Sequence, residues 1–251
     1  MADALLEVAG LTKRYRHIKA LDGVNLTVQP GEFIGFIGPN GAGKTTAMRC
    51  IAGQLLPDEG KISVGGCSVI DDPVRARGQV GYVSQDLAIY PYLTGEEFLR
   101  FVADARGVPG AEQDARVEDL LEMTELTEAR SRILREYSGG MARKIAIAAA
   151  LIARPPLLLL DESFVGLDPE STFALCQRFS RFCEEGGAIL LSSHILDMLE
   201  RVCTRVVLLD RGQIRLDMDR AALDATIGHT HPSLTDLYMD VTGKARANRR
   251  A

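Results

Sequence analysis

Short runs of apolar residues alternate along this chain with longer stretches in which apolar residues recur every three or four positions. Unbroken apolar runs of strand length are typical of parallel strands that are covered on both faces. Such runs occupy residues 33–37, 157–160, 188–191 and 206–209. Because amphipathic helical segments separate these runs, we predict an α/β fold built on a mostly parallel sheet.

Additional short strands are predicted near the N-terminus and near the end of the pattern. The turn Arg211-Gly212 leads from the last apolar run into a strand at 213–216, and residues 61–64 and 79–83 also have strand character. Residues 5–9 and 24–28 form two further strands, separated by a turn-rich stretch and closed by Pro30-Gly31. We expect these two strands to form an N-terminal antiparallel β subdomain beside the main sheet.

The segment from about residue 87 to 153 has a helical pattern. Thr94, with Glu97 three residues later, predicts a capping box at the start of the first helix. Apolar positions at helical spacing follow in two helices, at Phe98, Phe101, Val102 and Ala105, and at Val117, Leu120, Leu121 and Leu126. We therefore predict a single domain over residues 1–220 with a helical subdomain (about 87–153) inserted in it, then a short C-terminal helical extension and basic tail over 221–251.

The composition is that of a globular protein and excludes several classes. The 251 residues are 46% hydrophobic and 25% charged, which is ordinary for a folded domain. A formal net charge of −5 argues against nucleic acid as a partner, since only residues 244–250 are notably basic. The five cysteines form no C-x-x-C pair, so we expect small buried side chains in a reducing compartment rather than a zinc site.

No membrane-spanning segment or signal peptide is expected. The longest uninterrupted apolar run, residues 145–153, is far short of the roughly 20 residues that a spanning helix needs. We expect the chain to be soluble by itself and to reach a membrane only through a partner.

One apolar strand leads directly into a phosphate-binding motif. The pattern G-x-x-x-x-G-K-T between a strand and a helix is a P-loop, whose backbone N–H groups and helix N-terminus attract a polyphosphate. Its residues are Gly38, Pro39, Asn40, Gly41, Ala42, Gly43, Lys44, Thr45 and Thr46. A chance glycine-rich turn would lack both the strand and the helix, so we predict a P-loop NTPase core. Lys44 would reach the terminal phosphates and Thr45 would ligate Mg²⁺.

Polar side chains also follow three other predicted strands. Gln85 comes after 79–83, Asp161 and Glu162 end the run at 157–160, and His194 follows 188–191. Ligands of open parallel sheets bind at the carboxyl ends of strands, and adjacent buried carboxylates are costly unless a cation or a reaction uses them. We predict that Asp161 holds Mg²⁺ and that Glu162 faces the attacking water. An isolated histidine would more often be structural, but the position of His194 favours a role at the site.

Two weaker signals remain open when considered alone. Ser138-Gly139-Gly140 begins a helix and forms either a second anion-binding helix end or merely an N-cap with a flexible lead-in. Tyr15, among basic residues, either stacks on a nucleotide base or is a surface residue.

In this order, the motifs resemble those of one family, the ATP-binding cassette ATPases of ABC transporters. The match covers residues 5–216, most of the chain. The resemblance implies that Tyr15 stacks on adenine, that Gln85 contacts Mg²⁺ and the attacking water, and that His194 is the switch histidine. Residues 137–141 are similar to the family signature L-S-G-G-Q, which binds the γ-phosphate of ATP held by the opposite subunit. Residues 166–168 are similar to the interface loop.

The resemblance also implies the cofactors and the partners. ATP and Mg²⁺ are the expected cofactors, with Glu162, His194, Gln85 and Lys44 as catalytic residues and with Thr45, Gln85 and Asp161 as metal ligands. The P-loop, Tyr15 and Ser138, Gly139 and Gly140 would bind nucleotide. The expected partners are a second copy of the chain or a paralogous ATPase subunit, and an integral membrane permease. The chain would then be cytoplasmic and peripheral on the cytoplasmic face of the membrane.

The chain departs from the family pattern at a few positions. Tyr137 and Met141 replace the Leu and Gln of the signature, and Ser163-Phe164 stand where Pro-Thr is common. The signature changes, with the ending at residues 233–243, are most similar to exporters of the ABC-2 type. The alternatives are a soluble ABC-type ATPase acting on ribosomes or DNA, which would usually carry two P-loops, and a regulatory ATPase outside transport.

Overall fold

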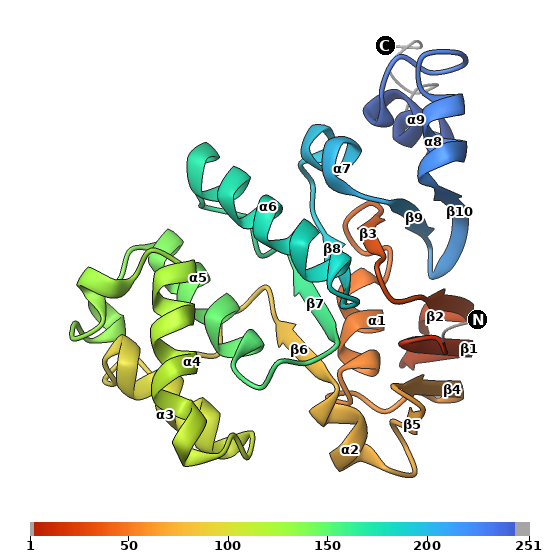
Figure 1. Ribbon diagram of the computed structural model, residues 1–251. Coiled ribbons are helices and arrows are strands. Elements are labelled where there is room, and N and C mark those ends of the chain that lie inside the picture. Colours follow the sequence, from red (N-terminus) through yellow and green to blue (C-terminus); the bar gives the residue numbers. More distant parts are fainter. Residues whose placement is uncertain (1–2, 244–251) are drawn as a thin grey trace.

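The computed structural model describes residues 3–243 and has one largely parallel sheet at its centre (Figure 1). The strand order is β10-β9-β3-β8-β7-β6, and β10 is the antiparallel strand at one edge. The strands are β3 (Phe33–Ile37), β6 (Val80–Val83), β7 (Leu157–Asp161), β8 (Ala188–Ser192), β9 (Arg205–Asp210) and β10 (Gln213–Asp219). The predicted α/β fold with a mostly parallel sheet is confirmed.

The sheet is buried because apolar side chains cover both of its faces. Every residue of β3, β7 and β8 is buried, and alternate side chains enter different cores, as the two-residue period of a strand requires. Leu157 and Leu159 pack in the core that contains α1 (Lys44–Ile51), whereas Leu158 and Leu160 pack with α6 (Pro169–Glu184) and α7 (Leu196–Val202). The loops that follow these strands therefore project from a rigid support.

A second, antiparallel sheet lies beside the first (Figure 1). It has the order β2-β1-β4-β5 and consists of β1 (Leu6–Tyr15), β2 (Ile18–Val28), β4 (Glu59–Val64) and β5 (Cys67–Ser68). The N-terminal antiparallel subdomain is thus confirmed, but both of its first strands are longer than predicted. Tyr15 pairs with Ile18 at the tip of the β1-β2 hairpin, so most of the turn-rich stretch expected between the two strands is itself part of the hairpin.

Helices between β6 and β7 form a separate lobe, at the lower left of Figure 1. They are α3 (Gly95–Ala105), α4 (Gly110–Met123) and α5 (Gly139–Leu151), with short 3₁₀ turns at Thr127–Ala129 and Leu134–Glu136. The predicted capping box is present, since Thr94 Oγ1 accepts from Glu97 N while Glu97 accepts from Thr94 N. The lobe has an apolar core of its own, which includes Phe98, Val117 and Ile145.

The remaining helices cover the sheets or extend the C-terminus. They are α2 (Pro73–Gly78), which the sequence analysis did not predict, and α8 (Arg220–Thr226) and α9 (Leu234–Val241). The basic tail lies outside the described residues. Within residues 3–243, no helix is both long enough and apolar enough to cross a bilayer.

The cysteines are buried free thiols, as predicted. Cys50 and Cys67 lie in the core that contains α1, and Cys176, Cys183 and Cys203 lie in the core that contains α6 and α7.

Candidate functional site

A cavity of about 630 Å³ opens where the P-loop meets the carboxyl ends of β7 and β8. The strand order explains this arrangement, because β3 is bonded to β8 and β8 to β7, so the loops after all three strands leave from the same edge. Predicted site residues that line the cavity are Tyr15, Asn40, Gly41, Ala42, Gly43, Lys44, Thr45, Thr46, Gln85, Asp161, Glu162 and His194. Gly38, Pro39, Ser138, Gly139 and Gly140 do not line it.

The P-loop backbone fits tightly between its neighbours. Gly43 is the N-cap of α1 with φ 109°, and a Cβ there would lie 2.4 Å from the carbonyl oxygen of Ala20. A Cβ on Gly38 would lie 2.1 Å from the carbonyl oxygen of Leu209. Only glycine fits at these two positions, because any side chain would displace backbone of β2 or β9. No side chain caps α1, so its first N–H groups face the cavity as donors for an anion.

Lys44 brings a positive charge to the cavity. Its ammonium group donates to the carbonyl oxygens of Gly38 at 2.7 Å and Pro39 at 3.3 Å, and the residue is only 8% exposed. Burial lowers the pKa of Lys44, and the charges of Glu162 and Asp161 oppose that shift. Lys44 is therefore a partly desolvated cation, a form suited to polyphosphate.

Asp161 and Glu162 are buried, and three of their four carboxylate oxygens accept no hydrogen bond from the described residues. Asp161 Oδ2 and both Glu162 oxygens are the atoms without a hydrogen bond, although Glu162 Oε1 also lies 3.2 Å from His194 Nε2. Glu162 also has φ 50°, a strained conformation for a residue with a side chain. Burying carboxylate oxygens without hydrogen bonds costs free energy, so their presence here indicates a site built to receive a cation or donor groups.

Ser192 connects the Asp161 carboxylate to the Glu162 backbone and was missed in the sequence analysis. Its hydroxyl is fully buried, donates to Asp161 Oδ1 at 2.6 Å and accepts from the Glu162 N–H at 3.1 Å. This leaves Asp161 Oδ2 as the free oxygen. The available signal was that Ser192 ends the strand that precedes His194.

His194 and Gln85 complete the cavity together with an arginine. His194 Nε2 lies 3.2 Å from Glu162 Oε1, and its side chain is half exposed. Arg143, on α5, also lines the cavity and donates to the carbonyl oxygen of Ser84 at 3.3 Å. Burial lowers the pKa of Arg143. No local sequence signal pointed to Arg143, because the folding of the helical lobe against the loop of Gln85 brings it there.

The segment at Ser138, Gly139 and Gly140 lies apart from this cavity. Ser138 caps α5, with its hydroxyl accepting from the Met141 N–H at 3.2 Å. A Cβ on Gly140 would lie 3.1 Å from the carbonyl oxygen of Gly166, so this segment packs closely against the loop at 166–167.

Comparison with known proteins gives a consistent result. A sequence model of the family described as ABC transporter matches residues 21–165. The ABC-type transporter ATP-binding protein EcsA of Bacillus subtilis is 34% identical over 95% of this chain and 97% of its own length. The daunorubicin/doxorubicin resistance ATP-binding protein DrrA of Streptomyces peucetius is 34% identical, over 89% of this chain and 68% of its own.

Solved structures agree with these relatives. An ATP-binding subunit of an ABC transporter is 36% identical and superimposes with a TM-score of 0.88, over 95% of this chain and 99% of that chain. A dimeric ATP-binding cassette bound to ADP and Pi in a post-hydrolysis state is 26% identical, with a TM-score of 0.79 over 86% of this chain and 98% of that one. The match over most of the chain, together with the P-loop cavity, shows that this chain belongs to the ABC transporter family as an ATP-binding and ATP-hydrolysing subunit.

Proposed function

We propose that two copies of this chain bind two ATP molecules head to tail and that hydrolysis drives a separate membrane permease. One observation carries the proposal: Ser138, Gly139 and Gly140 lie outside the cavity of their own P-loop. A phosphate bound by the P-loop can meet such a serine and glycine segment only from a second chain. The dimeric state of a structural relative supports this arrangement.

The residues of the cavity suit the binding of ATP with Mg²⁺. The P-loop N–H groups and Lys44 would hold the phosphates, and Tyr15 would stack on the base. The Thr45 hydroxyl, the Gln85 amide oxygen and the free Oδ2 of Asp161 are hard oxygen donors of the kind Mg²⁺ prefers, and Asp161 Oδ2 is buried with no hydrogen bond from any described residue. When bound, Mg²⁺ would neutralise charge on the β- and γ-phosphates.

The chain's own groups would then position the nucleophile. Glu162 has two buried oxygens free to accept from a water, and its backbone is fixed through Ser192. Such a carboxylate orients the water for in-line attack on the γ-phosphate and accepts its proton. His194, 3.2 Å from Glu162, would contact the γ-phosphate and link it to that carboxylate. Arg143 adds a positive charge near Gln85.

The relatives favour export. One is named for daunorubicin and doxorubicin resistance and another for Nod factor export, which suggests that this chain also powers an exporter. The permease would be a separate polypeptide, and this subunit would sit on the cytoplasmic face of the membrane through it.

The test separates assembly from catalysis. Glu162→Gln keeps the side chain's size and removes its charge, so nucleotide should still bind while ATP hydrolysis falls about 10²–10⁴-fold. With closure no longer reversed by hydrolysis, the variant should accumulate as an ATP-bound dimer in size-exclusion chromatography with Mg-ATP. Glu184→Gln, on the exposed surface, removes the same charge and should behave as wild type.

A second substitution examines the signature segment. Ser138→Arg in the Glu162→Gln background should dissolve the dimer, because the bulky side chain would block the opposite ATP. A Glu162→Gln protein that binds ATP but stays monomeric would refute the head-to-tail pair, and one that hydrolyses at the wild-type rate would remove Glu162 from catalysis.

A further inference from the structure

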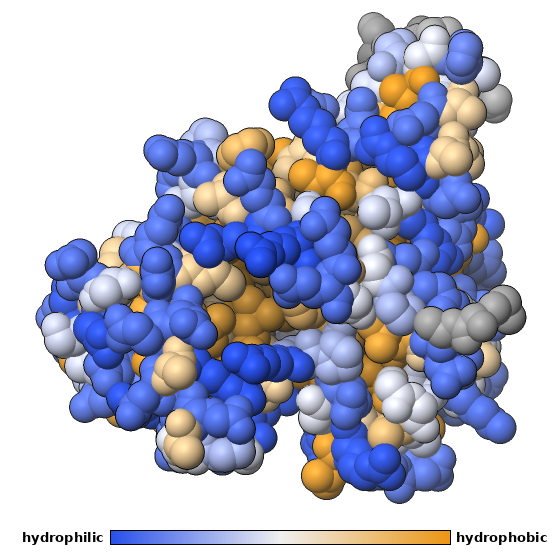
Figure 2. Space-filling view, in the orientation of Figure 1, coloured by the Kyte–Doolittle hydropathy of each residue, from blue (hydrophilic) through white to orange (hydrophobic). Residues whose placement is uncertain are grey.

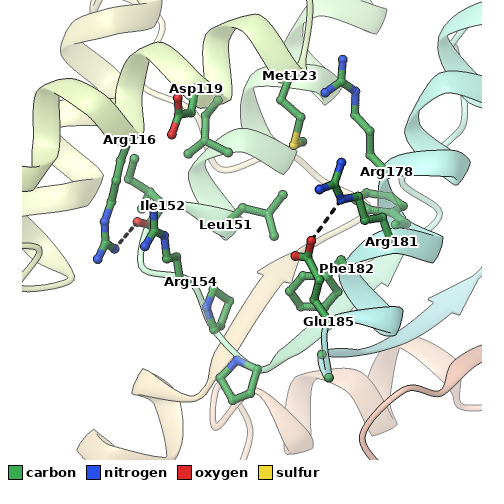
Figure 3. A pocket seen from close by; sticks show the side chains of 16 residues that line it. Arg116, Asp119, Met123, Leu151, Ile152, Arg154, Arg178, Arg181, Phe182 and Glu185 are labelled. Atoms are coloured by element: carbon green, nitrogen blue, oxygen red, sulfur yellow. Dashed lines mark hydrogen bonds and ion pairs between the residues drawn. The ribbon is translucent and has the colours of Figure 1, made fainter.

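A second large cavity, of about 580 Å³, lies between the helical lobe and the core. One wall is α4 with the end of α5, and the opposite wall is α6 (Figure 3). It shares no lining residue with the nucleotide cavity. Figure 2 shows the same region as a hollow with apolar surface, bordered by hydrophilic side chains. We call it the interlobe cleft.

Arginines line both walls of the interlobe cleft. Arg116 and Arg154 lie on the side of the helical lobe, and Arg178 and Arg181 lie on α6 (Figure 3). With Asp119 and Glu185 as the carboxylates of the lining, four arginines leave a formal excess of two positive charges. This excess is notable in a chain of net charge −5.

The arginines are only partly neutralised. Arg181 pairs with Glu185 at 3.0 Å, and Arg116 pairs with Glu112 at 2.5 Å and donates to the carbonyl oxygen of Ile152 at 2.8 Å. Arg154 and Arg178 make no side-chain hydrogen bond or ion pair with any residue in 3–243. The buried Nε of Arg116 also has no partner there. The interlobe cleft therefore offers unused guanidinium donors on both walls, including one that water does not reach.

The floor between these arginines is apolar. Leu151 lies between the two walls, and Met123 and Phe182 approach it from either side (Figure 3). Leu151 and Phe182 are only partly covered by the protein. Apolar surface with a few convergent charges is the arrangement of a ligand site for a small organic molecule, and the volume falls within the usual range. Inorganic phosphate alone would leave the floor exposed, and a neutral lipid would leave the guanidinium groups unpaired.

We propose that the interlobe cleft binds an organic anion with an apolar body, its acidic head held by Arg154 and Arg178 and its body lying on Leu151 and Phe182. Guanidinium groups bind carboxylate, sulfate and phosphate heads through paired N–H donors. Because the two walls belong to different lobes, the bound anion bridges the helical lobe and the core. This site is independent of the proposed head-to-tail assembly.

The test uses two probes with the same eight-carbon chain. Octyl sulfate is anionic and octyl glucoside is neutral, and both are titrated below micelle formation into the full chain by isothermal calorimetry. We expect saturable one-to-one binding of octyl sulfate, at least about tenfold tighter than octyl glucoside, as two charge-assisted contacts allow. Inorganic sulfate should bind at least about tenfold more weakly than octyl sulfate, because it cannot use the apolar floor.

Matched variants locate the binding. The double variant Arg154→Asn/Arg178→Ala should lower the affinity for octyl sulfate at least about tenfold. Asparagine is chosen because it tolerates the φ of 50° at residue 154. Arg211→Asn with Arg215→Ala is the control, since Arg211 has φ 48° and neither arginine lines the cleft. Arg178→Ala alone, at an exposed position on α6, provides a milder variant and should still weaken binding about threefold.

Several results would overturn the proposal. Equal affinity for octyl sulfate and octyl glucoside, or binding without saturation, would do so. An equal loss of octyl sulfate affinity in the control pair would also do so, as would unchanged affinity in folded Arg154→Asn/Arg178→Ala and Arg178→Ala proteins. Inorganic sulfate binding as tightly as octyl sulfate would show an anion site without a role for the apolar floor, which also overturns it.

Discussion

Asp161 and Glu162 are adjacent, yet the chain treats their carboxylates differently. Asp161 is the last residue of β7 and is fixed by the Ser192 hydroxyl, whereas Glu162 leaves the strand with φ 50° and keeps both oxygens without hydrogen bonds from the described residues. One carboxylate is thus oriented through a neighbouring strand and the other is turned towards the cavity. This difference suits one as a metal ligand and the other as a base.

Ser192→Ala should weaken the use of Mg²⁺ more than the binding of nucleotide. Losing a hydrogen-bond partner of a metal ligand commonly costs about 10–100-fold in metal affinity, so half-maximal ATPase activity should need about tenfold more Mg²⁺ or above. Binding of a fluorescent ATP analogue in EDTA should stay the same. Ser192→Thr should recover most of the wild-type Mg²⁺ requirement because it restores the hydroxyl.

Ser193→Ala is the matched control, since among residues 3–243 the Ser193 hydroxyl accepts only from the nearby Ile195 N–H. If Ser192→Ala lowers the affinity for nucleotide in EDTA by the same factor as it raises the Mg²⁺ requirement, Ser192 supports the fold of the site rather than positioning the Asp161 carboxylate.

Tyr15→Ala should weaken binding of ATP by ~1–3 kcal/mol, the range for stacking of a base on an aromatic ring. Tyr15 is 45% exposed and lines the cavity, so its ring is available to a ligand. Because stacking ignores the hydrogen-bonding pattern of the base, ATP and GTP should lose affinity together in equilibrium titrations. A loss confined to one nucleotide would exclude stacking.

At the scale of elements, burial decided what the sequence could predict. The runs that became β3, β7 and β8 were predicted because both faces of each strand are covered, which forces an unbroken apolar pattern. The hairpin at Tyr15 was not predicted, because the ends of β1 and β2 near its tip are polar and have register shifts. Ion pairs from Lys13 to Asp58 and from Arg14 to Glu59 hold that region, and such long-range pairs leave no periodic signal.

The same distinction applies to the site. The P-loop and the residues that directly follow strands were predicted, because the chemistry and the strand end are adjacent in sequence. Ser192 and Arg143 were missed because their roles depend on which strands are neighbours and on how the helical lobe folds back. Short α2, with six residues beginning at Pro73, was too brief to show helical periodicity.

Two exposed tyrosines in the segment before α3 are candidates for contact with the permease. Tyr92 is 76% exposed, whereas the Tyr90 ring lies 5.0 Å from that of Phe101 and 6.3 Å from that of Phe98. Tyr92→Ser should therefore lower co-purification with the membrane subunit while leaving ATP affinity and the melting temperature unchanged. Tyr90→Ser should lower both the co-purification and the melting temperature, since loss of aromatic packing costs about 0.5–1.5 kcal/mol of stability.

Ile18→Ser, at the hairpin tip, removes a comparable exposed apolar side chain and should leave co-purification unchanged. Wild-type recovery of the permease with Tyr92→Ser would place the contact elsewhere.

At the scale of the whole molecule, the three apolar cores divide the chain into parts that differ in independence. The two cores on opposite faces of the central sheet share strands β3, β7, β8 and β9, so they are mechanically joined. The helical lobe has a core built mainly from its own helices. Because the lobe has its own core, we expect it to behave as a unit, and the interlobe cleft lies at its boundary with the rest of the molecule.

The buried cysteines give this molecule internal reporters of local opening. Burial raises the pKa of Cys50 and Cys176 to about 11 and that of Cys183 to about 12, so in the folded protein at pH 7 these thiols stay protonated and react poorly. Ellman's reagent should therefore modify the native protein very slowly and all five thiols at once in denaturant. Rapid modification of any cysteine in the native protein would contradict the burial of that residue.

These thiols sit on opposite faces of one sheet, and the described part of the helical lobe has none. Under mild urea, the order in which cysteines become alkylated would therefore report whether the nucleotide face, with Cys50 and Cys67, or the α6 face, with the other three, opens first. ATP should slow alkylation of Cys50, which lies on α1, the helix that begins at the P-loop. A cysteine introduced into the helical lobe would then be modified alone, so a single label could follow that lobe without removing any native cysteine.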